Sequence, residues 1–124
     1  MTRADLLKLL ILGEIADDYE GLDHIASHVI TRAQLCGLSV SPEEVHGLLT
    51  DVLRSGFASA YDVSVDPPVQ VSAKEVIGHL QGYYFWATEE GKRWFRSSWA
   101  EWPFDEEGQL VSGWSAPDGW RTRS

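Results

Sequence analysis

Cysteine, basic residues and long apolar runs are scarce in this chain of 124 residues. Cys36 is the only cysteine, so no disulfide can form within the chain, as expected for a protein of the reducing cytoplasm. The apolar stretch over residues 6–12 is interrupted by Lys8 and is far too short to cross a membrane. Because acidic residues flank it, it also lacks the pattern of a signal peptide.

The charge balance is acidic, with 10 Lys and Arg against 19 Asp and Glu and a formal net charge of −9. The excess is spread along the chain, since residues 1–60 hold 4 basic and 9 acidic residues and residues 61–124 hold 6 and 10. An acidic surface repels phosphate and anionic lipid. This composition argues against non-specific binding to nucleic acid or membranes, without forbidding a local basic patch.

Motifs of common enzyme classes are also missing. The chain has no Gly-x-Ser-x-Gly motif, no phosphate-binding glycine loop and no dinucleotide fingerprint. Cys36 and His46 lack the surroundings of a nucleophile and its base. The many acidic residues fall in expected turns, caps and outer helix faces, where solvation accounts for them. We therefore expect neither an enzyme nor a bound cofactor.

The chain does contain enough apolar material for one domain, with 44% hydrophobic and 11% aromatic residues. Apolar residues at helical spacing predict a largely buried helix over residues 4–17 and an amphipathic helix over residues 22–36, which Gly37 ends. We expect an α+β fold, with a domain in residues 1–102 and an irregular tail in residues 103–124.

Residues 41–57 carry the most informative pattern, a capped amphipathic helix that ends on glycine and enters a strand. Ser41 is expected to cap this helix, Pro42 fits its first position, and Glu44 completes a capping box. Gly56 lies where a left-handed C-terminal cap is wanted. Five apolar residues at 3.6-residue spacing form the buried stripe: Val45, Leu48, Leu49, Val52 and Leu53. The outer face is left with Glu43, His46, Gly47, Thr50, Asp51 and Arg54.

A β-ribbon with a helical insertion is expected next. Alternating apolar and polar residues over 57–65 predict a half-buried strand, which two prolines at 67 and 68 break. Ser72 and Glu75 form a second capping-box pattern, which opens a short helix through Leu80 that Gly82 ends.

An aromatic strand over residues 83–87 and a last helix are expected after the insertion. Thr88 is the expected cap of this helix. Three of its aromatic side chains are expected to point inward: Trp94, Phe95 and Trp99.

Two clusters of turn residues beyond Trp102 predict an irregular tail with one short hairpin at most. Tryptophan is unusual in a disordered segment, so part of the tail is expected to pack on the domain or on a partner. The candidates for this interaction are Trp102, Trp114 and Trp120.

The expected order of elements resembles the winged helix-turn-helix regulators of the PadR and MarR type. The likeness covers roughly residues 4–99 and rests on three segments, residues 5–15, 41–57 and 85–95. The last is the most specific, because those families commonly leave the wing through a turn similar to Thr88-Glu89-Glu90-Gly91. The resemblance implies a third helix in the major groove of DNA, a wing against the backbone and often a homodimer.

The same resemblance implies which residues would contact double-stranded DNA. His46, Thr50 and Arg54 of the third helix would face the groove. Arg32 would approach phosphates from the second helix, and Lys74 from the wing. The expected function is then that of a DNA-binding transcriptional regulator.

A second interpretation is a winged helix that has lost DNA binding and contacts another protein. The third helix has one arginine beside Glu43, Glu44 and Asp51, and like charge facing phosphate is costly. Even a generous count gives only three cations per subunit that could contact phosphate, whereas DNA-binding domains often make about 6–10 phosphate contacts. The long insertion of residues 66–82 also suits a protein contact. The sequence leaves both interpretations open.

Two further groups of residues could carry a site. His24 and His28 have the four-residue spacing of a metal pair, but a third ligand would have to come from Asp17, Glu20 or elsewhere. The sequence therefore favours a solvated stripe with Arg32 and no metal.

The second group is the aromatic and basic segment of residues 83–99. Aromatic residues at strand and helix spacing favour core packing over a surface on which bases stack. Lys92, Arg93 and Arg96 are the best basic patch of the chain and are expected to skirt the buried face of the last helix.

Overall fold

The computed structural model describes residues 1–121, which form a mixed α+β fold of six α-helices, one 3-10 turn and four strands. The helical elements are α1 (Arg3–Ile15), α2 (Leu22–Leu35), α3 (Pro42–Arg54), α4 (Ala73–Val76), α5 (Glu89–Ser97), η1 (Trp99–Glu101) and α6 (Asp118–Arg121). The strands are β1 (Glu20–Gly21), β2 (Ala58–Asp62), β3 (Val69–Val71) and β4 (Tyr84–Ala87). No helix among the described residues is long and apolar enough to span a membrane.

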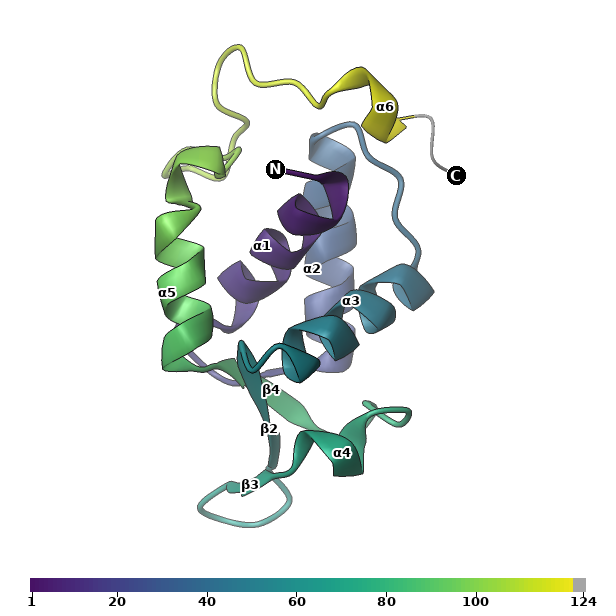
Figure 1. The fold of residues 1–124 in the computed structure, drawn as a ribbon, viewed down its shortest axis with the longest axis vertical. Helices are drawn as coiled ribbons and strands as arrows, with labels where there is room; N and C mark the ends of the chain where they lie inside the picture. The colour runs from purple at the N-terminus through teal and green to yellow at the C-terminus, as the bar shows by residue number, and fades with distance from the viewer. Residues whose placement is uncertain (122–124) are drawn as a thin grey trace.

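The longer helices gather around α1. Figure 1 shows α1, α2, α3 and α5 grouped together, with the sheet and α4 at one end of the molecule and the C-terminal segment passing over the other. Helix α1 packs against α2, α3 and α5, which is why its apolar residues surround most of its circumference. Seven of them are buried: Leu6, Leu7, Leu9, Leu10, Ile11, Leu12 and Ile15.

The ends of α1 and α2 follow local capping rules. Thr2 accepts a hydrogen bond from the Asp5 amide and the Asp5 carboxylate accepts one from the Thr2 amide, both at 3.0 Å. This capping box starts α1 at Arg3 and was not predicted from the sequence. Helix α2 ends at Leu35, close to the predicted stop, and Gly37 has the positive φ of 80° that favours glycine.

The junction of α3, β2 and α5 confirms the predicted glycine stop and the predicted cap. Gly56 has a φ of 78° after the end of α3, as a left-handed terminus requires. The Thr88 hydroxyl donates to the Gly56 carbonyl at 2.6 Å and accepts from the Gly91 amide at 3.1 Å. A Cβ atom on Gly91 would lie 2.0 Å from the carbonyl oxygen of Phe57, so only glycine fits.

The antiparallel sheet has the strand order β1-β4-β2-β3. The pairing of β2 with β4, which places Ala60 opposite Phe85, agrees with the expected ribbon. Strands β1 and β3 were not predicted, because two and three residues are too few to display an alternating pattern. They flank the ribbon and complete the sheet.

Two elements that precede β4, the strand β2 and the short helix α4, are shorter than predicted. Strand β2 ends at Asp62, because the Asp62 carboxylate accepts hydrogen bonds from the amide and hydroxyl of Ser64 and so forms a turn. Helix α4 ends at Val76, well before Leu80, since Gly78 adopts a φ of 96° that no helix continues through. We name residues 63–83 the β2–β4 insertion.

The C-terminal segment packs on the domain, as expected for part of it. Phe104 and Ala116 are buried in the same hydrophobic core as the helices. Phe104 and Leu110 form an isolated antiparallel bridge, which is the short hairpin that the turn residues predicted. Gly13 of α1 makes room for Trp102, since a Cβ there would lie 2.7 Å from the indole ring.

The inward orientation predicted for Trp99 is wrong, because its side chain is 56% exposed. Helix α5 ends at Ser97, and Trp99 begins the 3-10 turn, which has a different number of residues per turn. Trp99 stacks on Trp102 with ring centroids 5.5 Å apart. Trp94 and Phe95 do pack against the core as predicted.

Candidate functional site

The outward stripe of α3 consists of His46, Thr50 and Arg54, and we name it the α3 stripe. Arg54 is exposed, whereas His46 and Thr50 are half-buried. The Thr50 hydroxyl donates to the carbonyl of His46 within the same helix at 3.0 Å. The residues expected to read DNA thus lie on one face of α3, but two of the three are partly covered.

A pocket of about 350 Å³ lies between this stripe and the β2–β4 insertion. Its walls come from three parts of the chain: His46, Gly47 and Thr50 of α3, residues 78–81 of the insertion, and Leu22 of α2. Leu22 and Leu80 are both buried and supply apolar surface, while the histidines and Gln81 supply polar groups. A Cβ on Gly47 would meet nothing within 4 Å, so the pocket is open at this point.

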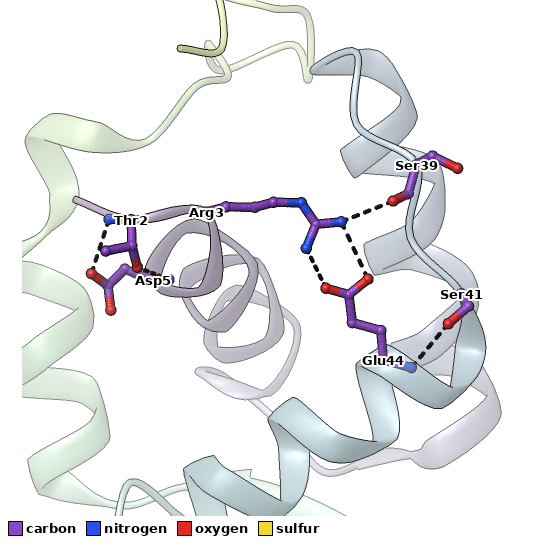
Figure 2. Close-up of polar contacts among 6 residues, drawn as sticks. All are labelled: Thr2, Arg3, Asp5, Ser39, Ser41 and Glu44. Atoms are coloured by element: carbon purple, nitrogen blue, oxygen red, sulfur yellow. Dashed lines mark hydrogen bonds and ion pairs between the residues drawn. The ribbon is translucent and has the colours of Figure 1, made fainter. Parts of the chain in front are cut away.

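Glu44 does not complete the capping box that its spacing predicts. Ser41 caps α3 as expected, accepting from the Glu44 amide at 3.1 Å. The Glu44 carboxylate pairs with the Arg3 guanidinium of α1, which also donates to the Ser39 carbonyl at 2.9 Å (Figure 2). The capping-box prediction for Glu44 is therefore wrong, because a cation from another helix is the stronger partner. Glu44 thus ties α3 to α1, with its carboxylate charge paired to a cation.

The exposed charges near the α3 stripe, and over the whole described chain, are mostly acidic. Four Lys and Arg side chains described in residues 1–120 are exposed: Arg54, Lys74, Arg93 and Arg96. Fourteen acidic residues in the same range are exposed: Asp17, Asp18, Asp23, Glu43, Asp51, Asp66, Glu75, Glu89, Glu90, Glu101, Asp105, Glu106, Glu107 and Asp118. The folded surface is therefore more one-sided in charge than the composition alone.

The remaining cations of the predicted sites differ in their surroundings. Lys74 is exposed on α4, as a phosphate contact from the insertion would need. Lys92 is half-buried, with its ammonium 5.4 Å from the ring centre of Trp86 and 3.9 Å from the Glu89 carboxylate. Arg93 and Arg96 project from α5 into solvent. Lys92 thus lies at the edge of the buried face of α5, as expected, whereas Arg93 and Arg96 do not.

Arg32, the phosphate candidate on α2, is engaged in the fold. Its Nη1 lies 3.0 Å from Oε2 of Glu14, at the end of α1. Its guanidinium also lies over the rings of Trp102 and Phe104, at 5.5 Å and 5.7 Å from their centres. Arg32 therefore joins α1 and α2 to the start of the C-terminal segment.

The histidines of α2 are exposed, as predicted for a solvated stripe, but they are also directed to one carboxylate that was not predicted. His24 Nε2 and His28 Nδ1 lie 3.3 Å and 3.2 Å from Oε1 of Glu14. We name His24, His28 and Arg32 the α2 stripe, and together with Glu14 the Glu14 cluster. The sequence shows that the three residues of α2 share a face, but Glu14 is missed because helix packing alone brings it there.

The tryptophans proposed as interaction residues of the tail are half-buried. Trp102, Trp114 and Trp120 all pack against the hydrophobic core. Their role in holding the C-terminal segment on the domain follows directly from these contacts. A role toward a partner stays a prediction.

Cys36 is buried at the end of α2, with 2% of its surface exposed. Burial raises the pKa of its thiol to about 11. A thiol with so high a pKa is protonated at neutral pH, and the thiolate is the nucleophilic form. Cys36 thus has the properties of a packing residue.

Comparison of the chain with models of protein families, with curated proteins and with solved structures finds no match in any of the three.

Proposed function

We propose that this chain is a winged-helix domain in which α3 and the β2–β4 insertion bind a segment of another protein. The partner segment would be basic and would place one apolar side chain in the pocket beside His46, Gly47 and Thr50. The order of the three helices, the β2–β4 ribbon and the capped α5 supports the winged-helix part of the proposal.

One observation carries the choice of a protein over DNA: residues 78–81 line the same pocket as the outward residues of α3. An α-helix with its side chains is about 10–12 Å across, and the major groove of B-DNA is about 12 Å wide. A helix with a second chain segment beside its outward face is too wide for that groove. The same segment gives a peptide two walls to pack between.

The charge of the surface supports a basic partner. Glu43 and Asp51 are exposed on α3 near the pocket, and Glu75 is exposed on α4. Complementary charge raises the association rate and selects among partners, whereas phosphate would be repelled. Leu22 and Leu80 line the pocket and offer the apolar contact that an anchoring side chain of a partner requires.

A DNA titration tests the choice of partner class. Fluorescently labelled random duplex is titrated with the full chain at low salt, where phosphate contacts are strongest. We expect no binding up to about 100 µM protein, the weak end of typical non-specific DNA affinities. Binding that weakens steeply with added salt would overturn the proposal in favour of a DNA-binding regulator.

A peptide titration tests the pocket itself. The probes are Lys-rich peptides with a central Leu, compared with the same peptides carrying Ser or with Leu peptides in which Glu replaces Lys. We expect only the basic Leu peptide to bind, and Gly47→Trp to weaken it at least tenfold by filling the pocket. Gln34→Trp, on the exposed surface of α2, is the matched control and should bind like the unaltered chain. Equal binding by the two variants would exclude the pocket.

A DNA-binding regulator is the second candidate, because Arg54 on α3 and Lys74 on α4 are both exposed on the elements that would face DNA. In that case Arg54→Ala and Lys74→Ala would each reduce the salt dependence of DNA binding. The slope of log affinity against log salt would fall by about 1 for each lost phosphate contact.

A further inference from the structure

We propose that Glu14, His24 and His28 form a binding site for one zinc ion where α1 meets α2. The ligand atoms are Oε1 of Glu14, Nε2 of His24 and Nδ1 of His28, which all lie within 4.8 Å of one another. Oε2 of Glu20 lies 3.3 Å from His24 Nε2 but outside this group of three, so Glu20 would have to move toward the ion to take the fourth position, which a water molecule could otherwise fill. This inference stands independently of what the α3 stripe binds.

The chain brings these ligands together from three consecutive elements. Glu14 lies in the last turn of α1, Glu20 in β1, and His24 and His28 in the first two turns of α2. Residues four apart in a helix share a face, and that face of α2 is turned toward the end of α1. The site is therefore built on two helices that pack directly on each other, which holds its ligands in place.

The distances from Glu14 to the two histidines match the edges of a tetrahedral zinc site. Zinc bonds nitrogen and carboxylate oxygen at about 2.0–2.2 Å, so neighbouring ligand atoms in a tetrahedron are about 3.3–3.5 Å apart. The observed separations are 3.2 Å for Glu14 to His28, 3.3 Å for Glu14 to His24 and 3.3 Å for Glu20 to His24. Hydrogen bonds between charged nitrogen and carboxylate oxygen are shorter, at about 2.7–2.9 Å.

The two oxygens of Glu14 have separate partners, which suits a metal ligand. The Glu14 side chain is only 6% exposed, and its Oε2 is held by Arg32 at 3.0 Å. Its Oε1 faces the two histidines. Residues that orient a ligating carboxylate in this way tune the affinity of metal sites. Arg32 would therefore be a positioning residue, itself supported by the ring of Trp102 at 5.5 Å.

An ion can reach the ligands from solvent, because the side chains of His24 and His28 are 41% and 50% exposed. Two imidazoles with one or two carboxylates are a typical donor set for zinc. The ligand class is thus a borderline divalent cation that prefers nitrogen and oxygen donors. The alternative is a cluster held only by ion pairs between Glu14 and the α2 stripe.

The experiment titrates zinc chloride into the full chain without a polyhistidine tag, with binding measured by competition against a chromophoric chelator. We expect one zinc per chain and a melting temperature that rises with zinc and returns to its starting value with EDTA. Cobalt in place of zinc should give the strong visible absorption of a tetrahedral site. A stoichiometry well below one, or no zinc binding, would overturn the proposal.

Variants of single histidines provide the test and its controls. His24→Gln and His28→Gln should each weaken zinc binding more than tenfold, whereas His46→Gln and His79→Gln should leave it unchanged. Arg32→Gln should weaken binding by about tenfold, the low end of effects from residues that orient ligands. The α2 histidines are partly exposed, so circular dichroism of these variants should match that of the unaltered chain. If zinc affinity were unchanged in His24→Gln and His28→Gln, the zinc site would be excluded. Glu14 and the α2 stripe would then form only an ion-pair cluster.

Discussion

The α2 stripe and the α3 stripe have the same spacing and different surroundings. His24, His28 and Arg32 stand four residues apart, and so do His46, Thr50 and Arg54. All three α2 side chains converge on the Glu14 carboxylate of another helix. The α3 side chains instead border a pocket, with Arg54 exposed beyond it.

This difference shows what helical spacing can and cannot predict. Spacing determines which residues share a face, because 3.6 residues make a turn. It does not determine whether that face meets solvent, a carboxylate or another chain segment. Substitutions that change what surrounds each stripe should therefore affect the two helices differently.

The largest effect is expected from Gly91→Ala, which disturbs the end of α3 without touching the α2 stripe. The new Cβ would lie 2.0 Å from the Phe57 carbonyl oxygen and would force the N-terminus of α5 away from β2. We expect a loss of about 3 kcal/mol in the free energy of unfolding, measured by urea denaturation.

Gly47→Ala is the matched control for that change, since it adds the same methyl group to a helix glycine in open space. Alanine favours helix over glycine, so this variant should be more stable by up to about 1 kcal/mol. If the Gly91→Ala protein were as stable as the unaltered chain, the backbone at Phe57 would be able to shift away from the new methyl group at little cost in free energy.

Glu14→Gln removes the carboxylate on which the α2 stripe converges and should have the next largest effect. The variant removes the negative charge that pairs with Arg32. Glu14, the residue that is changed, has a largely buried side chain. Because Arg32 is itself 36% exposed, solvent limits the loss to about 1–2 kcal/mol in the free energy of unfolding. The measurement is made in EDTA, which separates ion pairing from metal binding.

Asp51→Asn on the exposed face of α3 is the control for Glu14→Gln. It also removes one carboxylate charge, and we expect a change within about 0.5 kcal/mol. Equal effects of the two variants would mean that the Glu14 carboxylate contributes no more to stability than an exposed carboxylate on α3.

Arg3→Ala tests the ion pair with Glu44 that joins α1 to α3. The Arg3 side chain is 11% exposed and that of Glu44 is 35% exposed, so the pair is partly screened by solvent. We expect a loss of about 1 kcal/mol, measured by thermal or urea denaturation. Arg54→Ala, which removes an exposed arginine from the last turn of α3, should change stability by less than about 0.5 kcal/mol.

The smallest effect at neutral pH is expected from Cys36, at the end of α2. With a pKa of about 11, the native thiol should hold about a hundredfold less thiolate at pH 8 than a thiol of pKa 9.0. A thiol-specific dye should therefore react far more slowly with the native chain than with the chain in urea. Equal rates would show that the end of α2 opens freely.

The same pKa shift predicts how stability changes at alkaline pH. The folded thiol has the higher pKa, so its contribution is complete below the unfolded pKa and is lost as the pH rises toward 11. The free energy of unfolding should fall between pH 8 and pH 11 more in the unaltered chain than in Cys36→Ala. The other ionisable groups are common to both chains and cancel in this comparison.

Much of the helical framework could be predicted from the sequence, because its signals are local. Ser41, Pro42 and Gly56 define α3 through contacts within a few residues of each end. Thr88 and Gly91 mark α5 in the same way. The elements that could not be predicted are the short ones, such as β3, whose strand character comes from pairing with β2.

The candidate sites were predictable only as faces of single helices. The sequence places His24 beside His28, and His46 beside Thr50. It does not show that Glu14 joins the first pair or that Leu80 lies beside the second, since these residues are separated from them by 10 or more positions. Contacts of that kind depend on how helices pack and where an insertion folds back.

The sequence alone was sufficient for the boundaries of α2 and α3, for the buried stripes and for the acidic character of this protein. These follow from periodicity, caps and charge, which act over a few residues or over the whole composition. Only the tertiary structure decided that Glu44 pairs with Arg3, that the α2 stripe surrounds Glu14, and that the β2–β4 insertion borders α3. The physical reason is that a side chain's partner is set by the three-dimensional packing of distant segments, which local spacing does not encode.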